Sequence, residues 1–402
     1  MLVIPGVARA RRAVAIIASA SAAMMLTACL STTPPTPTVA PSPTRTVLPT
    51  FTAAPPATAT AKATPTLTGT ATPAFTPTPV VTATPTVNPN INPLTGMAVS
   101  DASVLQKRPL HVCIDNDPPS RPQYGLDKAD VVYEYLMERF YNTRFTAVFW
   151  GQQAEHIGPI RSARLVNTEL TPQYDAMLVC SGGSDQVRWL LVTDKRFFNY
   201  GYLDIGIHDP NLKYFTVYGK NPVVNTLLLD TSTASIHQYL KDTSQEKTVK
   251  APGFTFSPSP AATPAAVPAT SISIPYPAEC CSVRWTYDAA KQRYLRAMNG
   301  APHLDGATKE QLSAANVIVL RARYTESDID EGYGAMGWRI GLQGEGTATI
   351  FRDGLAIPAT WQRKGLTDFM QLVDSSGHTI PLHPGNSWVE IVPDSNFEVT
   401  VQ

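Results

Sequence analysis

The chain has 402 residues, with 32 lysines and arginines against 32 aspartates and glutamates, so its formal net charge is zero. Such a balance produces no overall field that would attract nucleic acid or an anionic surface, and charged partners must be bound by local groups. The length allows two ordinary domains. The 36 prolines are gathered largely in two tracts, which indicates that part of the chain does not fold.

The N-terminus has a basic start, an apolar run over residues 13–28, and then Cys29. This order is typical of a secretory signal peptide (1–28) rather than a spanning helix. Leu26 to Cys29 (Leu-Thr-Ala-Cys) resembles a bacterial lipoprotein signal, which implies cleavage before Cys29 and acylation of its sulfur, for example by palmitate. The alternative is an ordinary secreted protein with a chance cysteine. Acyl chains anchor without spanning, so we expect a lipid-anchored protein that faces outward from the membrane.

Residues 29–90 form a tract of threonine, proline and alanine with almost no charge and few large apolar residues. This composition predicts a disordered, semi-rigid stalk of polyproline type. About 60 residues at roughly 3.1 Å each would reach up to roughly 190 Å from the lipid. Threonine beside proline also suits O-glycosylation.

Residues 92–245 are predicted to form an α/β domain with a mixed sheet, because short strands alternate with short helices. We expect strands at 110–114, 131–136, 144–150 and 176–179, and helices at 161–169, 185–192 and 227–240.

A second tract rich in proline, alanine and serine, 251–277, is interpreted as a linker or an exposed insertion. From 278 to 402 turn residues recur at roughly ten-residue intervals, which predicts an all-β, sandwich- or barrel-like domain. Its expected strands are 283–288, 293–296, 316–323, 347–351, 356–363, 368–373, 379–382 and 387–392.

With Cys29 acylated, four cysteines remain, and in an oxidising compartment they are compatible with two disulfides. Adjacent Cys280 and Cys281 bridge each other only with strain, so we expect each to face elsewhere. The other two are Cys113 and Cys180, and the pairing stays open. No C-x-x-C spacing of a zinc site is present, so no metal and no cofactor are expected.

Several motifs occur in one order along the chain and are similar to those of the YerB-type bacterial lipoprotein family, whose core is the DUF3048 domain of unknown function. They include Asp115-Asn116, Gly125 to Glu134, Gly158 to Arg164, Gly182-Gly183-Ser184 and Pro384-Gly385-x-x-Trp388. The resemblance covers roughly residues 92–400, apart from 251–277. It implies a cell-envelope lipoprotein with an N-terminal α/β domain and a C-terminal β-rich domain, and no established activity. Family members usually carry a histidine just before Gly-Gly-Ser, where this chain has Cys180-Ser181.

The stretch from Gly158 to Arg164 is the centre of the predicted site. Arg161 and Arg164 would share one face of a helix, and the Gly-Gly-Ser turn would present backbone N–H groups. Arginines are planar donors for carboxylate or phosphate. The predicted ligand-binding set is Asp115, Asn116, Arg121, Glu134, Arg144, Arg161, Arg164, Gly182, Gly183 and Ser184. The alternative is that Arg161 and Arg164 pair with acids of the fold and hold loops.

Catalysis is the second hypothesis. Asp115 and Glu134 are the obvious carboxylate pair for a cell-wall glycan hydrolase, although Asp115 also fits a turn and Glu134 an ion pair. A nucleophilic mechanism would use Ser184 or Cys180, with His208 as the base. The sequence around Ser184 lacks the Gly-x-Ser-x-Gly elbow, which weakens this hypothesis. We therefore expect an envelope lipoprotein that binds an anionic glycan, a peptidoglycan fragment or an envelope protein, and no nucleic acid.

Overall fold

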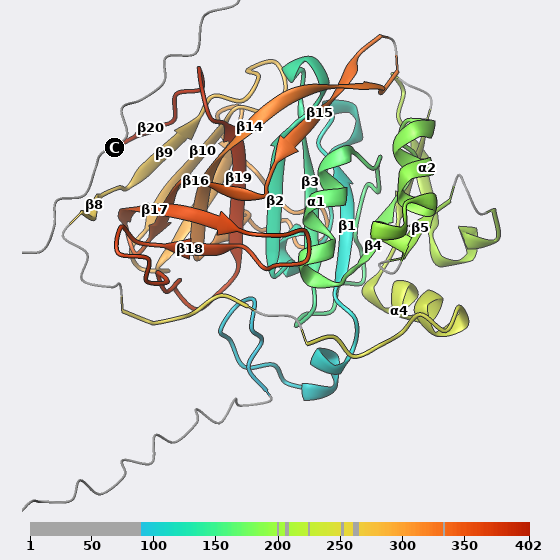
Figure 1. The fold of residues 1–402 in the computed structure, drawn as a ribbon, viewed down its shortest axis with the longest axis horizontal. Coiled ribbons are helices and arrows are strands. Elements are labelled where there is room, and N and C mark those ends of the chain that lie inside the picture. Colours follow the sequence, from blue (N-terminus) through green and yellow to red (C-terminus); the bar gives the residue numbers. More distant parts are fainter. Residues whose placement is uncertain are drawn as a thin grey trace, which may run out of the picture. The chain divides into compact units, whose positions relative to one another are not determined.

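The computed structural model describes residues 90–198, 201–205, 209–223, 226–250, 253–259, 265–332 and 334–402. These residues belong to one compact unit that spans residues 81–402. The predicted signal peptide, Cys29, nearly all of the predicted stalk and His208 lie outside the described residues. Within the described ranges the structure is rich in strands and contains only short helices (Figure 1).

A large mixed sheet is the main feature, and in the described part of the chain it has twelve strands. Its order is β18-β17-β16-β14-β19-β2-β3-β1-β4-β5, with β15 paired to β14 and β8 to β17. The strands are β1 (Leu110–Asp115), β2 (Val131–Leu136), β3 (Thr143–Phe149), β4 (Met177–Cys180), β5 (Tyr202–Asp204), β8 (Val267–Pro268), β14 (Asn316–Asp330), β15 (Met336–Gly341), β16 (Gly344–Arg352), β17 (Leu355–Arg363), β18 (Gln371–Val373) and β19 (Ser387–Pro393).

The parallel pair β2–β19 joins the two halves of the chain, with a register that runs from Val131 opposite Ser387 to Tyr135 opposite Ile391. We predicted an α/β domain and a separate all-β sandwich or barrel. The mixed sheet is present, but the central strands of the C-terminal half continue it instead of forming a sheet of their own. Alternating hydrophobicity reveals strands but not their partners, and the sequence therefore could not show this junction.

A second sheet contains six described strands in the order β12-β11-β10-β9-β20, with β13 paired to β11, and a third is the hairpin β6–β7. Part of the predicted linker 251–277 is pleated sheet, since it contains β8, which pairs in the main sheet, and β9, which pairs in the second sheet. The alternation of buried isoleucine with half-buried serine in β9 explains its pairing. The strands are β6 (Thr216–Lys220), β7 (Leu227–Asp230), β9 (Ser271–Ile274), β10 (Val283–Asp288), β11 (Arg293–Met298), β12 (Ala301–Pro302), β13 (Ser313–Ala314) and β20 (Thr400–Val401).

The α-helices of the described residues are α1 (Leu165–Leu170), α2 (Asp185–Thr193), α3 (Lys195–Phe198) and α4 (Thr233–Asp242). Three expectations need correction. The helix predicted over 161–169 begins only at Leu165, and the one predicted over 227–240 is split into strand β7 and helix α4. Residues 379–382 form no strand, only isolated bridges at Thr379 and Leu382.

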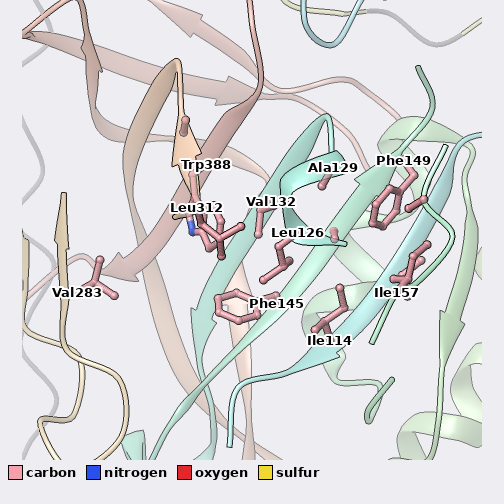
Figure 2. Close-up of a cluster of buried hydrophobic side chains, with 14 of the residues drawn as sticks. Ile114, Leu126, Ala129, Val132, Phe145, Phe149, Ile157, Val283, Leu312 and Trp388 are labelled. Atoms are coloured by element: carbon pink, nitrogen blue, oxygen red, sulfur yellow. The ribbon is translucent and has the colours of Figure 1, made fainter. Parts of the chain in front are cut away.

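Buried side chains cover both faces of the main sheet. One cluster includes Ile114, Val132, Phe145 and Trp388 together with residues of the second sheet such as Val283, and Figure 2 labels all five. Another cluster includes alternate residues of the same strands, which point to the opposite face.

Two disulfides are present in the described residues, and they settle the open pairing. Cys113 within β1 is bonded to Cys180, the last residue of β4. Cys280 is bonded to Cys281, contrary to the expectation that each would face elsewhere.

Candidate functional site

The segment from Gly158 to Arg164 is extended and hydrogen-bonded on both sides. The amide of Arg161 donates to the carbonyl of Cys113 at 3.0 Å, and the amide of Ala163 donates to the carbonyl of Gly182 at 2.9 Å. Because these tertiary bonds hold the backbone, the predicted shared helical face of Arg161 and Arg164 is wrong: Arg164 is the N-cap of α1 and Arg161 lies outside the helix.

Glycine is needed at the start of this segment. A Cβ atom at Gly158 would lie 2.6 Å from the carbonyl oxygen of Leu229, which is closer than van der Waals contact allows. The amide of Ile160 also donates to that carbonyl, at 2.8 Å. The segment is therefore pressed against β7 before it reaches Arg161.

Beside this segment lies a cavity of about 890 Å³. Of the predicted residues, Arg144, Arg161, Arg164, Gly182 and Gly183 line it. Met137, Ile205, Leu227, Leu229 and Ala335 contribute apolar surface. The charged lining residues are Arg139, Arg144, Arg161, Arg164, Arg188, Glu138 and Glu331.

Arg144 and Arg161 line one part of the wall, and together with the buried Asp115 that they contact we call them the cation-rich cluster. Arg144 on β3 is directly opposite Asp115 on β1 in the antiparallel register, and its Nη2 donates to Asp115 Oδ1 at 3.1 Å. Arg161 Nε lies 3.7 Å from Asp115 Oδ2. Burial alone would raise the pKa of Asp115, but the two guanidinium groups outweigh burial and lower that pKa.

A second part of the wall, the acid-rich cluster, consists of Glu138, Glu331 and Arg164. Arg164 Nε donates to Glu138 Oε1 and lies 3.5 Å from Glu331 Oε2. Burial alone would lower the pKa of Arg164, but the two carboxylates raise it. Burial raises the pKa of Glu331, and nearby Glu138 adds to the rise while Arg164 opposes it.

The Gly-Gly-Ser turn has protein partners of its own. The amide of Gly182 donates to Asp204 Oδ1 at 3.3 Å, and that of Ser184 donates to Glu331 Oε2 at 3.3 Å. The Ser184 hydroxyl accepts from the Val187 amide and so caps α2. Ser184 is thus a cap and does not line the cavity.

Asn116 and Arg121 also lie outside the cavity lining. Asn116 is buried, and its amide group donates to Thr143 Oγ1 at 2.8 Å and accepts from Gln123 at 2.9 Å. Arg121 Nη2 donates to the carbonyls of Asn116 and Cys280, at 2.8 and 2.9 Å. Both residues brace loops, which does not support their predicted contact with a ligand.

Glu134 belongs to a different, closed arrangement, which we call the Arg296 cluster. Arg296 on β11 donates to Glu134 Oε2 at 2.7 Å and to Glu390 Oε1 at 3.1 Å, and all three side chains are 0% exposed. Glu134 and Glu390 are opposite each other on the parallel strands β2 and β19. The guanidinium carbon of Arg296 lies 4.4 Å from the centre of the Trp388 ring, an arrangement that favours the cation.

The remaining atoms of the Arg296 cluster are also hydrogen-bonded. Arg296 Nε donates to His303 Nδ1 at 2.9 Å, so Nε2 carries the proton of a neutral ring and donates to Gln123 Oε1 at 2.9 Å. Burial lowers the pKa of His303, and the positive charge of Arg296 adds to this effect. Burial also raises the pKa of Glu390, with a further contribution from Glu134, to about 8.

Asp115 and Glu134 face opposite sides of the sheet. Asp115 is opposite Arg144, whereas Glu134 is opposite Phe145. Directly opposed residues share a face and successive residues of one strand alternate, so the two carboxylates point away from each other. Asp115 is 2% exposed, Glu134 is 0% exposed, and neither lines the cavity. The predicted carboxylate pair does not converge on one crevice.

Four charged lining residues were missed in the sequence: Arg139, Arg188, Glu138 and Glu331. Arg188 lies in the first turns of the helix that follows Gly-Gly-Ser, and its Nε donates to Asp204 Oδ2 at 2.9 Å. Its position beside a predicted site motif could have drawn attention to it. Glu331 comes from the turn between β14 and β15, far along the chain, and no sequence pattern links it to the motif.

Two further properties concern only the described residues. No group of three or more histidine, cysteine, aspartate or glutamate side chains is placed to hold a metal ion there. Among the helices of these ranges, each falls short of the length and apolar character needed to cross a membrane.

Sequence comparisons identify the class of protein. Residues 94–202 match "Protein of unknown function (DUF3048) N-terminal domain", and residues 272–389 match the corresponding C-terminal domain. The chain belongs to the DUF3048 family and carries both of its domains, which confirms the resemblance read from the motifs. Arg161 and Arg164 lie in the first matched region and Glu331 lies in the second, so the cavity contains residues of both.

The relatives are YerB proteins. The chain is 29% identical over 308 residues to "Putative lipoprotein YerB" of Bacillus subtilis (strain 168), covering 75% of this chain and 86% of that protein. The crystal structure of YerB from Bacillus subtilis matches with a TM-score of 0.64 and 25% identity, covering 77% of this chain and 99% of that one.

Proposed function

We propose that this chain is a lipid-anchored protein of the bacterial cell envelope that binds an anionic ligand in the arginine-lined cavity. Anchoring through Cys29 is supported by the Leu26 to Cys29 pattern and by the name of the relative, which describes a lipoprotein. The ligand is a component of the envelope that bears carboxylate or phosphate, such as an anionic glycan, a peptidoglycan fragment or a partner protein, on the outer side of the membrane.

The observation that carries the binding proposal is a set of unsatisfied arginine N–H groups. Arg144 Nε, Arg161 Nε and Arg188 Nη2 are buried and find no hydrogen-bond partner within the described residues, and all three side chains line the cavity. A buried donor without an acceptor is costly. An anion that enters the cavity would add acceptor atoms to this wall.

Arg161 and Arg164 differ in how fully their side chains are bound by other groups of the protein. Arg164 is held by Glu138 and Glu331 and so fits the alternative of an arginine that holds loops. In the part of the chain that the structure describes, the Arg161 side chain donates only to Thr226 Oγ1, at 2.6 Å, besides its longer approach to Asp115. Burial and the neighbouring charge of Arg144 lower the pKa of Arg161 even though Asp115 opposes them, which indicates incomplete compensation. Arg161 is therefore the principal ligand-binding residue of the proposal.

A glycan hydrolase that uses Asp115 and Glu134 gains no support from this geometry. Each carboxylate is buried and bound by arginine, and the two face opposite sides of the sheet. General acid–base chemistry on a glycan requires both groups to reach the same bond.

The test is calorimetric titration of the purified mature chain, in detergent micelles, with N-acetylmuramyl dipeptide and with poly(glycerol phosphate). A neutral N-acetylglucosamine trimer serves as the uncharged probe. We expect saturable binding of at least one anionic probe, no binding of the neutral one, and a loss of roughly tenfold or more in affinity in Arg161→Ala, since hydrogen bonds to charged groups are strong.

Arg323→Ala is the matched control, because Arg323 is exposed, forms one loose ion pair with Asp394 and lies outside the cavity lining. It should bind as the unaltered chain does. Equal affinity in Arg161→Ala and Arg323→Ala, or binding of the neutral trimer alone, would contradict the proposal.

A further inference from the structure

The cation-rich cluster has an excess of positive charge. Arg144 and Arg161 share one carboxylate in contact, that of Asp115. Asp117, two residues along, is half-buried and forms no ion pair within 4.0 Å of either arginine among the described residues, so that its charge acts on both arginines only from a greater distance. Arg188 on the same cavity is balanced by Asp204. This part of the wall therefore offers one uncompensated positive charge at close range.

The acid-rich cluster has the opposite excess. Glu138 and Glu331 share one guanidinium group, that of Arg164. Arg139 also lines the cavity, but it is exposed and donates to the carbonyl of Gly334, so water screens its charge. Two carboxylates with one buried arginine leave one uncompensated negative charge.

One oxygen of Glu331 could accept a hydrogen bond from a ligand. Its side chain is 1% exposed, and while Oε2 is approached by Arg164 and the Ser184 amide, Oε1 is buried without any partner in the described residues. A buried carboxylate oxygen of this kind is as costly as an unsatisfied donor. The cavity thus has unmet donors on the cation-rich side and an unmet acceptor on Glu331.

We propose that the ligand of the cavity is a zwitterion of amino-acid type, an amino acid or short peptide, whose carboxylate meets Arg161 and whose ammonium group meets Glu331. This inference rests on the proposed function and narrows its ligand class. A purely anionic ligand would satisfy the arginine N–H groups but leave Glu331 Oε1 unpaired. An ammonium group supplies the missing donor and compensates the acid-rich cluster at the same time.

The rest of the lining suits the body of such a ligand. Ile205, Leu227 and Leu229 provide apolar surface against which aliphatic side chains can pack. The volume of about 890 Å³ lies in the range of sites for molecules larger than a single small amino acid.

The test compares probes that differ only in their charges, using the mature chain in detergent. Alanine and alanyl-alanine carry both charges, their N-acetyl derivatives carry only the carboxylate, and their amides carry only the ammonium group. We expect the better of the two zwitterions to bind about tenfold tighter than its N-acetyl derivative, in keeping with one added charge-assisted hydrogen bond. The amides should bind most weakly.

Glu331→Gln should abolish the preference for the zwitterion and leave the affinity for the N-acetyl derivative within about twofold, since the carboxylate contacts remain. Glu345→Gln is the matched control, because Glu345 is exposed on β16 and outside the cavity lining. Should Glu331→Gln fail to fold, Glu331→Asp, which keeps the charge but shortens the side chain, should reduce the same preference.

The outcomes separate the two proposals. If an N-acetyl derivative binds as tightly as its zwitterion, or if Glu331→Gln keeps the preference, the zwitterion inference is overturned while an anion site remains. If no anionic or zwitterionic probe binds, the proposed function fails and this inference fails with it.

Discussion

The Arg296 cluster and the acid-rich cluster of the cavity have the same composition, one arginine between two glutamates, yet they differ in how completely they are satisfied. Around Arg296 all three side chains are 0% exposed, and none of their nitrogen or oxygen atoms is among the buried atoms without a partner. Around Arg164 the side chains of Arg164 and Glu138 are partly exposed, and one oxygen of the buried Glu331 side chain is unpaired within the described residues. Identical residue types can therefore close a core or leave a site open.

The difference follows from what surrounds each arginine. Arg296 lies among Trp285, Trp388 and Phe145. Tryptophan and tyrosine side chains donate further hydrogen bonds to the carboxylates of Glu134 and Glu390. Arg164 lies at a loop, at the edge of a cavity. Burying charged groups costs desolvation free energy, which is offset only when every group is paired. We therefore expect the Arg296 cluster to affect the stability of the fold and the acid-rich cluster to affect ligand binding.

The largest expected effect on stability is in the Arg296 cluster. Arg296→Met leaves Glu134 and Glu390 buried without their cation, which should lower the free energy of unfolding by about 3–5 kcal/mol. Arg161→Ala should cost about 1 kcal/mol or less, as partly exposed pairs do. Urea unfolding followed by tryptophan fluorescence measures both. Similar losses in the two variants would remove the distinction between the closed Arg296 cluster and the wall of the cavity.

A disulfide stabilises the region around the cavity. The Cys113–Cys180 disulfide joins β1 to the end of β4 across 67 residues of sequence, and the carbonyl of Cys113 accepts the hydrogen bond of the Arg161 amide. Replacing both cysteines by alanine should lower stability by about 2–4 kcal/mol, because the unfolded chain gains freedom. Thermal unfolding with and without reductant gives the value. A reductant effect that persists in the doubly substituted chain would show that the Cys280–Cys281 pair is responsible.

The pH dependence of stability tests how Glu390 is held. Its pKa in the folded chain is raised from 4.5 to about 8 by burial and by Glu134. Its contribution is therefore complete below about pH 4.5 and is lost as the pH rises toward 8. Glu390→Gln should remove this part of the slope, so that the variant gains stability relative to the unaltered chain between pH 5 and pH 8 by roughly 1 kcal/mol or more. A constant difference over that window would contradict the assignment.

The last expected effect concerns the Gly-Gly-Ser turn. Gly183 has a φ of 144°, and a Cβ atom there would lie 3.0 Å from the carbonyl oxygen of Ala163. Gly183→Ala should cost about 1–2 kcal/mol and weaken ligand binding by moving the cavity wall. Gly300→Ala is the control, since Gly300 also has a positive φ of 77° but nothing lies within 4 Å of the added carbon. It should lose stability by a similar or smaller amount and bind normally.

Local features of this molecule were predictable and distant pairings were not. The structure contains β1, β2, β3 and α2 where we expected the strands at 110–114, 131–136 and 144–150 and the helix at 185–192. These elements could be predicted because the hydrophobic pattern and the residues that start a helix lie within a short stretch of sequence. Arg144, Arg161, Arg164, Gly182 and Gly183 were placed in one site, and all five line the cavity.

What failed depended on register and on topology. Asp115 and Glu134 were assigned to one crevice because both lie near strand ends, but a one-residue difference in cross-strand pairing places them on opposite faces. Glu331 and Arg296 come from the C-terminal half, whose strand β19 pairs with β2 in the sheet that carries the N-terminal motifs. Neither fact is contained in any local stretch of sequence.

The most direct test of the account is NMR observation of the arginine Nε–H groups during titration with N-acetylmuramyl dipeptide and alanyl-alanine. We expect the signals of Arg144 and Arg161 to shift until the site is saturated, because ligand atoms accept hydrogen bonds from these groups, while the signal of Arg296 stays fixed. Saturable binding with no change at Arg144 or Arg161, or a shift confined to Arg296, would contradict the account.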